Sequence, residues 1–288
     1  MTPNGVATDA PCTRCGGREY LVTRGEELAE AVVCECRATC AKCKGARYVI
    51  AREGVYDVAV PCDCAALHRR VRAFNDARIP AGYADKRLTP SGPNDLHGFS
   101  DRKSESLKRA KAAVHRYRIS VDASQAQGLL LIGGFGVGKT HLVCGLVSYL
   151  TLERGIGCRF VDYHELMARI RATFDRKDET ENEAAIIEPL VQVPVLVIDD
   201  LGKGQGSNWE LTILDQIITR RYNARRIILA TTNYRPESEG GGESDKRRGL
   251  ESLEERIGGR LVSRLQASCE FMVLDVDDYR KTGPKAAR

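Results

Sequence analysis

The stretch that decides the fold reads Leu129-Leu130-Leu131-Ile132, followed by Gly133-Gly134-Phe135-Gly136-Val137-Gly138-Lys139-Thr140. Four consecutive apolar residues predict a short buried strand, and the next eight match the G-x-x-x-x-G-K-T pattern of a P-loop. Glycines in such a loop let backbone N–H groups surround phosphate oxygens, and the N-terminus of the helix that follows, predicted over residues 141–152, attracts the same anion. The sequence therefore predicts an α/β fold with a nucleotide site on this loop.

Two side chains of the loop have chemistry that can be assigned in advance. Lys139 is expected to neutralise the β- and γ-phosphates of ATP, and the hydroxyl of Thr140 is expected to bind Mg²⁺. The predicted nucleotide-binding residues are Gly133, Gly134, Phe135, Gly136, Val137, Gly138, Lys139, Thr140 and His141.

Polar side chains end two further predicted strands. Residues 195–198 are apolar and run into Asp199 and Asp200. Asp199 is the candidate that holds Mg²⁺ through water, and Asp200 is the candidate that orients and deprotonates the attacking water; a pair of helix-capping carboxylates is the structural alternative. Residues 226–230 run into Thr231-Thr232-Asn233, and the Asn233 amide could sense the γ-phosphate or hold that water.

Eight of the eleven cysteines form two copies of one pattern in the first 64 residues. Each member of the second copy lies 28 positions after its counterpart, and Tyr20 and Tyr48 repeat with the same spacing. Four thiols in two close pairs suit one tetrahedral Zn²⁺. The two predicted zinc sites are Cys12, Cys15, Cys34 and Cys36, then Cys40, Cys43, Cys62 and Cys64.

Several alternatives for this region stay open at this point. The thiols could form a redox dithiol, zinc ligands could cross between the repeats, and His68 could replace a cysteine, although a position on a helix is the simpler reading. The residues between the cysteine pairs have room for a hairpin, whose first strand would be 20–22 or 48–50. Few basic residues flank the pairs, which favours a protein partner over DNA for these modules.

Composition limits the class of protein. The chain has 288 residues, 42% of them hydrophobic, and a formal charge of +5, which two zinc–thiolate sites would bring close to neutral. No run approaches the roughly 20 apolar residues of a membrane span, and residues 1–10 do not resemble a signal peptide. We therefore expect a cytoplasmic protein with no membrane contact.

The chain divides into four predicted parts. They are a duplicated zinc module over residues 1–66, a helical and irregular linker over 67–100, an ATPase domain over 101–281 and a disordered tail over 282–288. Apolar spacing predicts a helix over 65–78 and a second one that buries Leu107, Ala110, Val114 and Tyr117, with its basic face in solvent. Residues 236–249 are a Gly- and charge-rich insertion, and Trp209 is expected to pack.

Four segments together resemble AAA+ ATPases of the initiator and helicase-loader clade, in particular the DnaC/DnaI helicase loaders and the IstB transposition ATPases. They are the P-loop with His141-Leu142, Asp199-Asp200-Leu201-Gly202, Ala230-Thr231-Thr232-Asn233, and Arg260-Leu261-Val262-Ser263-Arg264-Leu265. The resemblance covers roughly residues 79–281. It implies a three-layer P-loop sandwich with a parallel sheet, here preceded by a small zinc-ribbon-like domain, and ATP hydrolysis at the residues named above.

The resemblance also implies contacts between molecules. Arg264 would reach the ATP of a neighbouring subunit as an arginine finger, with Arg260 as the second candidate and an ordinary surface arginine as the alternative. An extra helical element over 164–193 often lines a DNA path in this clade. Its basic residues could contact phosphates or be solvated: Arg169, Arg171, Arg176 and Lys177.

The function that follows from the resemblance is ATP-dependent loading of a DnaB-type replicative helicase onto single-stranded DNA. The zinc-bearing N-terminus would bind the helicase, and the ATPase domains would self-associate around DNA. One alternative is an IstB-like ATPase that regulates a transposase. Another is a zinc-dependent adaptor that binds nucleotide as a switch with little hydrolysis, against which the complete set of predicted catalytic side chains argues.

Overall fold

The structure, a computed structural model, describes residues 11–37, 39–88, 105–120, 127–174, 182–204, 207–236, 252–275 and 278. Its centre is a five-stranded sheet in the order β6-β7-β8-β5-β9, with every neighbouring pair parallel. The strands are β5 (Gly128–Gly133), β6 (Cys158–Asp162), β7 (Val195–Asp199), β8 (Ile227–Thr232) and β9 (Cys269–Leu274). The predicted P-loop strand, β5, lies inside the sheet between β8 and β9.

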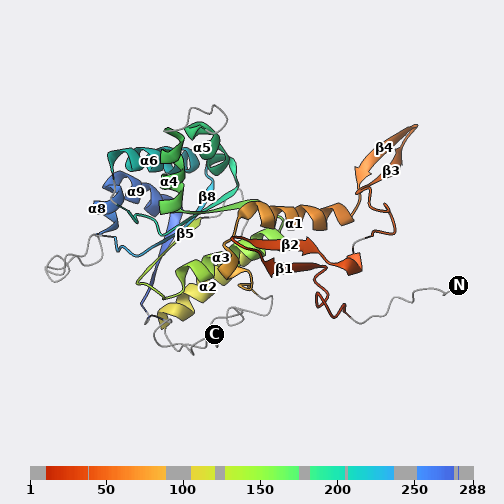
Figure 1. Ribbon diagram of the computed structural model, residues 1–288, viewed down its shortest axis with the longest axis horizontal. Coiled ribbons are helices and arrows are strands. Elements are labelled where there is room, and N and C mark those ends of the chain that lie inside the picture. The colour runs from red at the N-terminus through yellow and green to blue at the C-terminus, as the bar shows by residue number, and fades with distance from the viewer. Residues whose placement is uncertain are drawn as a thin grey trace.

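Helices cover both faces of this sheet and make the three layers that were predicted (Figure 1). Side chains of β5 alternate between two cores: Leu129 and Leu131 join one, and Leu130 and Ile132 join the other. The first core includes residues of α1 (Cys64–Ala77), α2 (Glu105–Ser120) and α3 (Lys139–Leu152). The second includes residues of α4 (Tyr163–Phe174), α5 (Glu183–Gln192), α6 (Asn208–Asn223), α8 (Leu253–Ile257) and α9 (Gly259–Ser268).

The two helices predicted ahead of the P-loop are present as α1 and α2. α1 ends where Arg78 adopts a left-handed conformation, with φ at 56°. On α2 the four predicted apolar residues are buried, but its basic face is not wholly in solvent, because Lys111 and Arg118 are buried too. The guanidinium of Arg118 lies 5.3 Å from the centroid of the Tyr149 ring, so this cation covers α3 instead of facing water.

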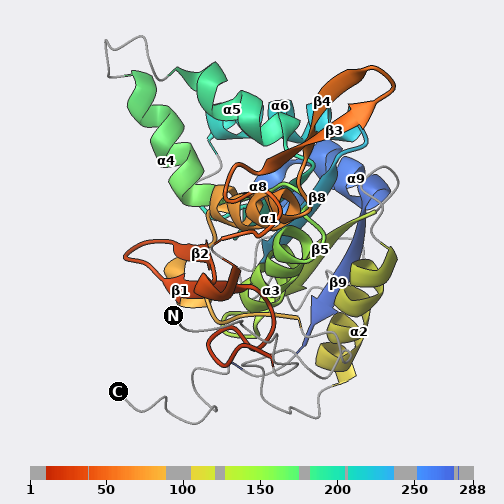
Figure 2. The same ribbon diagram turned by 90° about the vertical axis from the view of Figure 1, so that its right-hand side faces the viewer.

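Each cysteine repeat folds as an antiparallel hairpin, as expected. The first pairs β1 (Tyr20–Arg24) with β2 (Ala29–Val33), and the second pairs β3 (Tyr48–Glu53) with β4 (Tyr56–Pro61). A short 3₁₀ turn, η1 (Glu35–Arg37), follows β2, and a second one, η2 (Ala81–Tyr83), follows α1. The first hairpin lies along α1 beside the domain that contains the five-stranded sheet, whereas the second projects beyond the N-terminal end of α1 (Figures 1 and 2).

A buried arginine ties α5 to the sheet. Arg221 of α6 has no exposed side-chain surface, and its guanidinium donates hydrogen bonds of 2.5–3.2 Å to five backbone carbonyls. These belong to Leu190, Val191, Val193, Pro194 and Ile227. Burial lowers the pKa of Arg221 to about 9, which still leaves it charged at neutral pH.

We expect Arg221→Leu to lower the free energy of unfolding by roughly 3–5 kcal/mol, because it leaves buried carbonyls without donors. The neighbouring Arg220→Leu is the matched control. Arg220 is 40% exposed and forms only a 2.8 Å ion pair with Glu188, so its loss should cost less than about 1 kcal/mol. Urea unfolding of both variants measures the difference; equal midpoints would contradict the bracing role of Arg221.

Among the described helices, none combines the length and apolar character that a membrane span needs.

Candidate functional site

The P-loop connects β5 to α3 and places Lys139 at the first turn of that helix. The Lys139 ammonium group donates to the carbonyls of Gly133 and Gly134, both at 2.9 Å, and to Oδ1 of Asn233 at 2.7 Å. Gly138 precedes the helix with φ at 100°, a conformation that side chains rarely adopt. The loop therefore holds the lysine directly beside the amide at the end of β8, two residues that are 94 positions apart in sequence.

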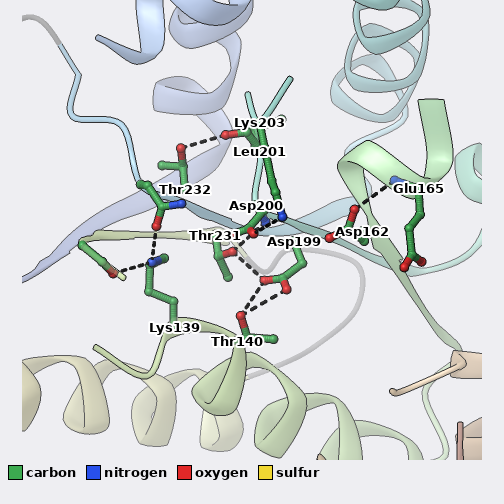
Figure 3. Close-up of polar contacts among 12 residues, drawn as sticks. Lys139, Thr140, Asp162, Glu165, Asp199, Asp200, Leu201, Lys203, Thr231 and Thr232 are labelled. Carbon is green, nitrogen blue, oxygen red and sulfur yellow. Dashed lines mark hydrogen bonds and ion pairs between the residues drawn. The ribbon is translucent and has the colours of Figure 1, made fainter. Parts of the chain in front are cut away.

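Thr140 and Asp199 also meet, and their oxygens are suitable Mg²⁺ ligands. The Thr140 hydroxyl lies 3.0 and 3.1 Å from the two carboxylate oxygens of Asp199 (Figure 3). Burial is the main cause that raises the pKa of the Asp199 carboxyl above its usual range, while hydroxyl donors act in the opposite direction. A divalent cation between these hard oxygen ligands would offset the cost of burying that charge.

Thr231 belongs to the same network and was not assigned a role from the sequence. Its hydroxyl donates to Oδ1 of Asp199 at 2.6 Å and accepts the backbone N–H of Asp200 at 3.0 Å. Thr231 therefore links the end of β8 to both acids at the end of β7 (Figure 3). The sequence carried a signal for it, a hydroxyl in the residue pair before Asn233, but nothing there indicated which of Thr231 and Thr232 faces the acids.

Asp200 is held in an unusual backbone conformation. Its φ is 53°, and its carboxylate lies 3.1 Å from the Lys203 ammonium. A non-glycine residue in the left-handed region is uncommon and recurs at functional sites. The two carboxylates have different partners: that of Asp199 contacts Thr140 and Thr231, whereas that of Asp200 contacts Lys203.

The arginine-finger candidates both lie on α9, but their surroundings differ. Arg264 is 18% exposed, and its guanidinium donates to Oδ1 of Asp215 at 2.7 Å and to Oγ1 of Thr219 at 2.5 Å, both on α6. Arg260 is 73% exposed and lies 3.9 Å from the same Asp215 oxygen. Arg264 is thus tied to its own subunit, and its role toward a neighbour stays a prediction.

The eight predicted zinc ligands gather into two clusters, each built from one repeat. Within Cys12, Cys15, Cys34 and Cys36, and within Cys40, Cys43, Cys62 and Cys64, the sulfur atoms all lie within 4.8 Å of one another. Representative Sγ–Sγ distances are 4.0 and 3.6 Å in the first cluster and 3.7 and 3.4 Å in the second. Zn–S bonds of about 2.3 Å in a tetrahedron place sulfurs about 3.8 Å apart, so both clusters fit zinc.

Each predicted ligand set therefore lies within one repeat, and neither cluster found among the described residues includes a histidine. His68 lies half-buried on α1, outside both clusters. Backbone donors point at one sulfur of each cluster: the N–H of Glu19 lies 3.4 Å from Cys15 Sγ, and that of Arg47 lies 3.3 Å from Cys43 Sγ. Burial works to raise both thiol pKa values, but these donors and neighbouring thiols lower them to about 7 and about 6.

Loss of each metal site should have different consequences for the rest of the protein. Cys15→Ser should release the first hairpin, whose Tyr20 is buried in the ATPase core and donates to Glu153 at 2.5 Å. Loss of a buried aromatic side chain costs about 3 kcal/mol, which corresponds to a fall of roughly 10 °C in melting temperature for a domain of this size. Cys43→Ser should leave that melting temperature within about 2 °C, because the second hairpin lies outside both cores.

Differential scanning calorimetry with zinc analysis on the same samples measures this effect. Each variant should lose one of two zinc ions, and only Cys15→Ser should shift the main transition. Equal shifts in both variants would contradict the separation of the two hairpins.

The P-loop has a further neighbour that the sequence did not indicate. The Asp278 carboxyl group lies against Gly136, where a Cβ would collide with it. Arg171, one of the basic residues predicted to face DNA or solvent, forms an ion pair with Glu210 at 3.0 Å. Its guanidinium also lies 5.4 Å from the centroid of the Trp209 ring, and the Trp209 side chain is partly buried. Arg176, Lys177, residues 237–249 and the tail from 282 lie outside the described residues.

Comparison with known proteins shows what this part of the chain is similar to. Residues 112–239 match the family model for IstB-like ATP binding proteins. The replicative helicase loader DnaC of Buchnera aphidicola subsp. Baizongia pistaciae is 27% identical over 180 residues, 62% of this chain and 65% of that protein. Over this part of the chain the protein is similar to IstB-like and DnaC-type ATP-binding proteins. DnaC of Escherichia coli K12 is 24% identical over 177 residues, 61% of this chain and 65% of that protein.

A solved structure shows the similarity to DnaC as well. The crystal structure of the DnaC helicase loader superimposes with a TM-score of 0.51 and 28% identity, covering 61% of this chain and 94% of that one. The chain spans about two thirds of the length of the DnaC proteins that it matches. The family model covers the P-loop and both acids at the end of β7, so the predicted fold class and the predicted resemblance to DnaC and IstB proteins are confirmed.

Proposed function

We propose that this DnaC/IstB protein is an ATPase that loads a DnaB-type replicative helicase onto single-stranded DNA. The observation that carries the proposal is the convergence of Lys139, Asn233, Thr140 and Asp199 at one edge of the sheet, in a chain that is similar to proteins named replicative helicase loaders. These residues come from three separate strand ends, and each has the chemistry that phosphoryl transfer from ATP needs.

In this proposal each residue has one task. Lys139 exchanges the carbonyls of Gly133 and Gly134 for phosphate oxygens, and Asn233, now beside the lysine, turns toward the γ-phosphate. Thr140 and Asp199 hold Mg²⁺, which would neutralise charge on the β- and γ-phosphates. Asp200 accepts a proton from the attacking water, and Thr231 fixes the position of both acids through its two hydrogen bonds.

Arg264 would complete the site of a neighbouring subunit, so hydrolysis would depend on assembly. In the single chain its guanidinium is held by Asp215 and Thr219. Self-association would exchange these contacts for the γ-phosphate of the neighbour. Helicase binding is assigned to the zinc-bearing N-terminal region, and hydrolysis would release the loaded helicase.

The test is a loading assay with purified components. The full-length zinc-loaded protein is mixed with the replicative helicase of its own host, and complexes are sized by native mass spectrometry with ATP, with ADP and without nucleotide. Helicase transfer to a closed circle of single-stranded DNA is then measured. We expect a defined complex and ATP-dependent transfer; absence of a complex in every nucleotide state would overturn the loader function.

A second candidate is regulation of a transposase, since the family model that matches residues 112–239 is that of IstB-like proteins. In that case the protein would not bind the helicase, and ATP turnover would instead rise with double-stranded DNA. The loading assay and a DNA-stimulated ATPase assay on the same preparation separate the two.

A further inference from the structure

The two hairpins share one sequence pattern, but the equivalent face of the ribbon is buried in the first hairpin and exposed in the second. In the first hairpin, Tyr20 pairs with Val33 and Val22 pairs with Ala31, so these side chains point to one side of the ribbon. Tyr20, Ala29 and Ala31 on that side are buried in the ATPase core, and Val22 and Val33 pack against it. The opposite side carries Thr23, Glu30 and Val32, all exposed.

The second hairpin repeats this face without covering it. Its register is the same, with Tyr48 opposite Pro61 and Ile50 opposite Ala59. Tyr48 is 53% exposed, Ile50 is 62% exposed, and Ala59 and Pro61 are exposed as well. We call these four residues the open apolar face. An exposed aromatic and aliphatic patch on a small, metal-clipped hairpin is a typical interaction surface.

The first hairpin shows what such a face accepts, which is a helix. β2 packs on α1, and the side-chain amide of Asn75 bonds both backbone groups of Ala31: its Oδ1 accepts the Ala31 N–H at 2.7 Å, and its Nδ2 donates to the Ala31 carbonyl at 3.0 Å. The Tyr20 hydroxyl donates to the carboxylate of Glu153, the residue directly after α3. The helix α1 thus supplies apolar side chains and the Asn75 amide to the first hairpin, and the Glu153 carboxylate accepts the hydrogen bond of Tyr20.

Among the helices that the structure describes, α1 is joined directly to the second hairpin, and it cannot cover the open apolar face in this way. Cys64 is both the last ligand of the second cluster and the first residue of α1, so the hairpin is fixed to that end of the helix without a linker. α1 has 14 residues, or about 21 Å at 1.5 Å per residue, and its buried side already contacts β2 and α3. The α1 of a second copy would be covered in the same manner.

Charges around the open apolar face differ from those in the first hairpin and indicate the kind of helix. Lys44 and Arg47 both precede Tyr48 in the sequence, and the equivalent positions of the first repeat hold Gly16 and Glu19. Both basic residues are exposed, and among the residues that the structure describes neither has an ion pair. This end of the face therefore complements an acidic segment.

From these observations we infer that the second hairpin is the partner-binding module, and that its open apolar face receives an amphipathic helix of another protein. That helix presents an apolar stripe to Tyr48 and Ile50, an Asn or Gln amide to the outer edge of β4 at Ala59, and carboxylates to Lys44 and Arg47. The first hairpin is a structural copy that closes the ATPase core. The identity of the partner as the replicative helicase rests on the proposed function.

The matched test compares the two sides of the same hairpin. The double variant Tyr48→Ser/Ile50→Ser removes the open apolar face, while Tyr56→Ser/Val58→Ser removes side chains that are 74% and 36% exposed on the opposite side. The probe is the helicase of the host, and affinity is measured by fluorescence anisotropy with full-length zinc-loaded protein. We expect the first variant to weaken binding on the order of 10–100-fold, as loss of two interface anchors does, and the second by less than about threefold.

Zinc content and melting temperature, measured on both variants, show that the hairpin remains folded. A photo-crosslinking p-benzoylphenylalanine in place of Tyr48 should form its crosslink to a helical segment of the helicase that contains acidic residues, whereas the same group in place of Tyr56 should not. Lys44→Glu/Arg47→Glu should weaken binding most strongly at low salt.

The outcomes separate this inference from the proposed function. A helicase complex that survives Tyr48→Ser/Ile50→Ser would leave the loader function standing and overturn the docking face. A crosslink from position 48 to a second copy of the chain would overturn the assignment of a different protein as occupant. Failure of the unaltered protein to bind the helicase in any nucleotide state would overturn both.

Discussion

Asp200→Asn should lower ATP turnover by about 10²–10⁴-fold, the usual contribution of a general base, while ATP binding stays within about threefold. The amide cannot accept a proton from water, but it keeps the size of the side chain. Asn is also among the residues that tolerate the left-handed conformation best, and Asp200 has φ at 53°, so the fold should persist. Single-turnover hydrolysis and binding of a fluorescent ATP analogue measure the two effects separately.

Asp162→Asn is the control for this prediction. Asp162 ends β6 beside Asp199 in the sheet register, but its carboxylate accepts the N–H of Glu165 at the start of α4 (Figure 3). It carries the same charge at the same edge of the sheet without facing the P-loop lysine. Turnover should therefore change less than about threefold; a loss as large as that of Asp200→Asn would show that general electrostatics, not proton transfer, explains the effect.

Arg264→Ala should lower turnover on the order of 10³-fold, the lower end of the effect of an arginine finger, at protein concentrations where subunits assemble. Arg260→Ala is the comparison, because Arg260 is on the same helix but more exposed. The structure allows a sharper design, since Asp200 and Arg264 would act on different ATP molecules if the finger works between subunits.

Two inactive variants should therefore restore activity when they are mixed. A subunit with Arg264→Ala retains Asp200, and a neighbour with Asp200→Asn retains Arg264, so one intact composite site forms at their contact. We expect the mixture to recover at least a tenth of wild-type turnover. If the mixture stays inactive while Arg264→Ala melts at a lower temperature, the residue serves only the bonds to Asp215 and Thr219 within its own chain.

The ATP-binding domain could be predicted from sequence because local patterns specified it. The apolar runs before Gly133 and Asp199 are strands in the central sheet, and parallel strands bring their carboxyl ends to one edge, which places Lys139, Asp199 and Asn233 near one another. The sequence did not show which of Thr231 and Thr232 contacts the two acids. Side chains alternate between the two faces of β8, and the face of each threonine depends on the register of that strand in the sheet.

Contacts between distant segments were beyond the sequence patterns. The tie between Arg264 and Asp215 joins two helices, and neither charge shows a local preference for the other. The different fates of the two hairpins were equally hidden, since Tyr20 and Tyr48 occupy equivalent positions in the repeat. The difference arises from α1, which covers the first hairpin and carries the second at its N-terminal end. Tyr20 is therefore buried in the core, whereas Tyr48 is exposed.

The position of β5 in the sheet has a consequence for the order in which the chain can fold during its synthesis. β5 has no partner strand that precedes it: Leu129 pairs with Leu229 on one side and with Glu270 on the other. The two hairpins close through contacts within a few tens of residues, so they can form while the rest of the chain is still being translated. The phosphate-binding loop cannot be held until nearly the last strand has left the ribosome, and a truncated chain would therefore carry its metal-binding modules without a working nucleotide site.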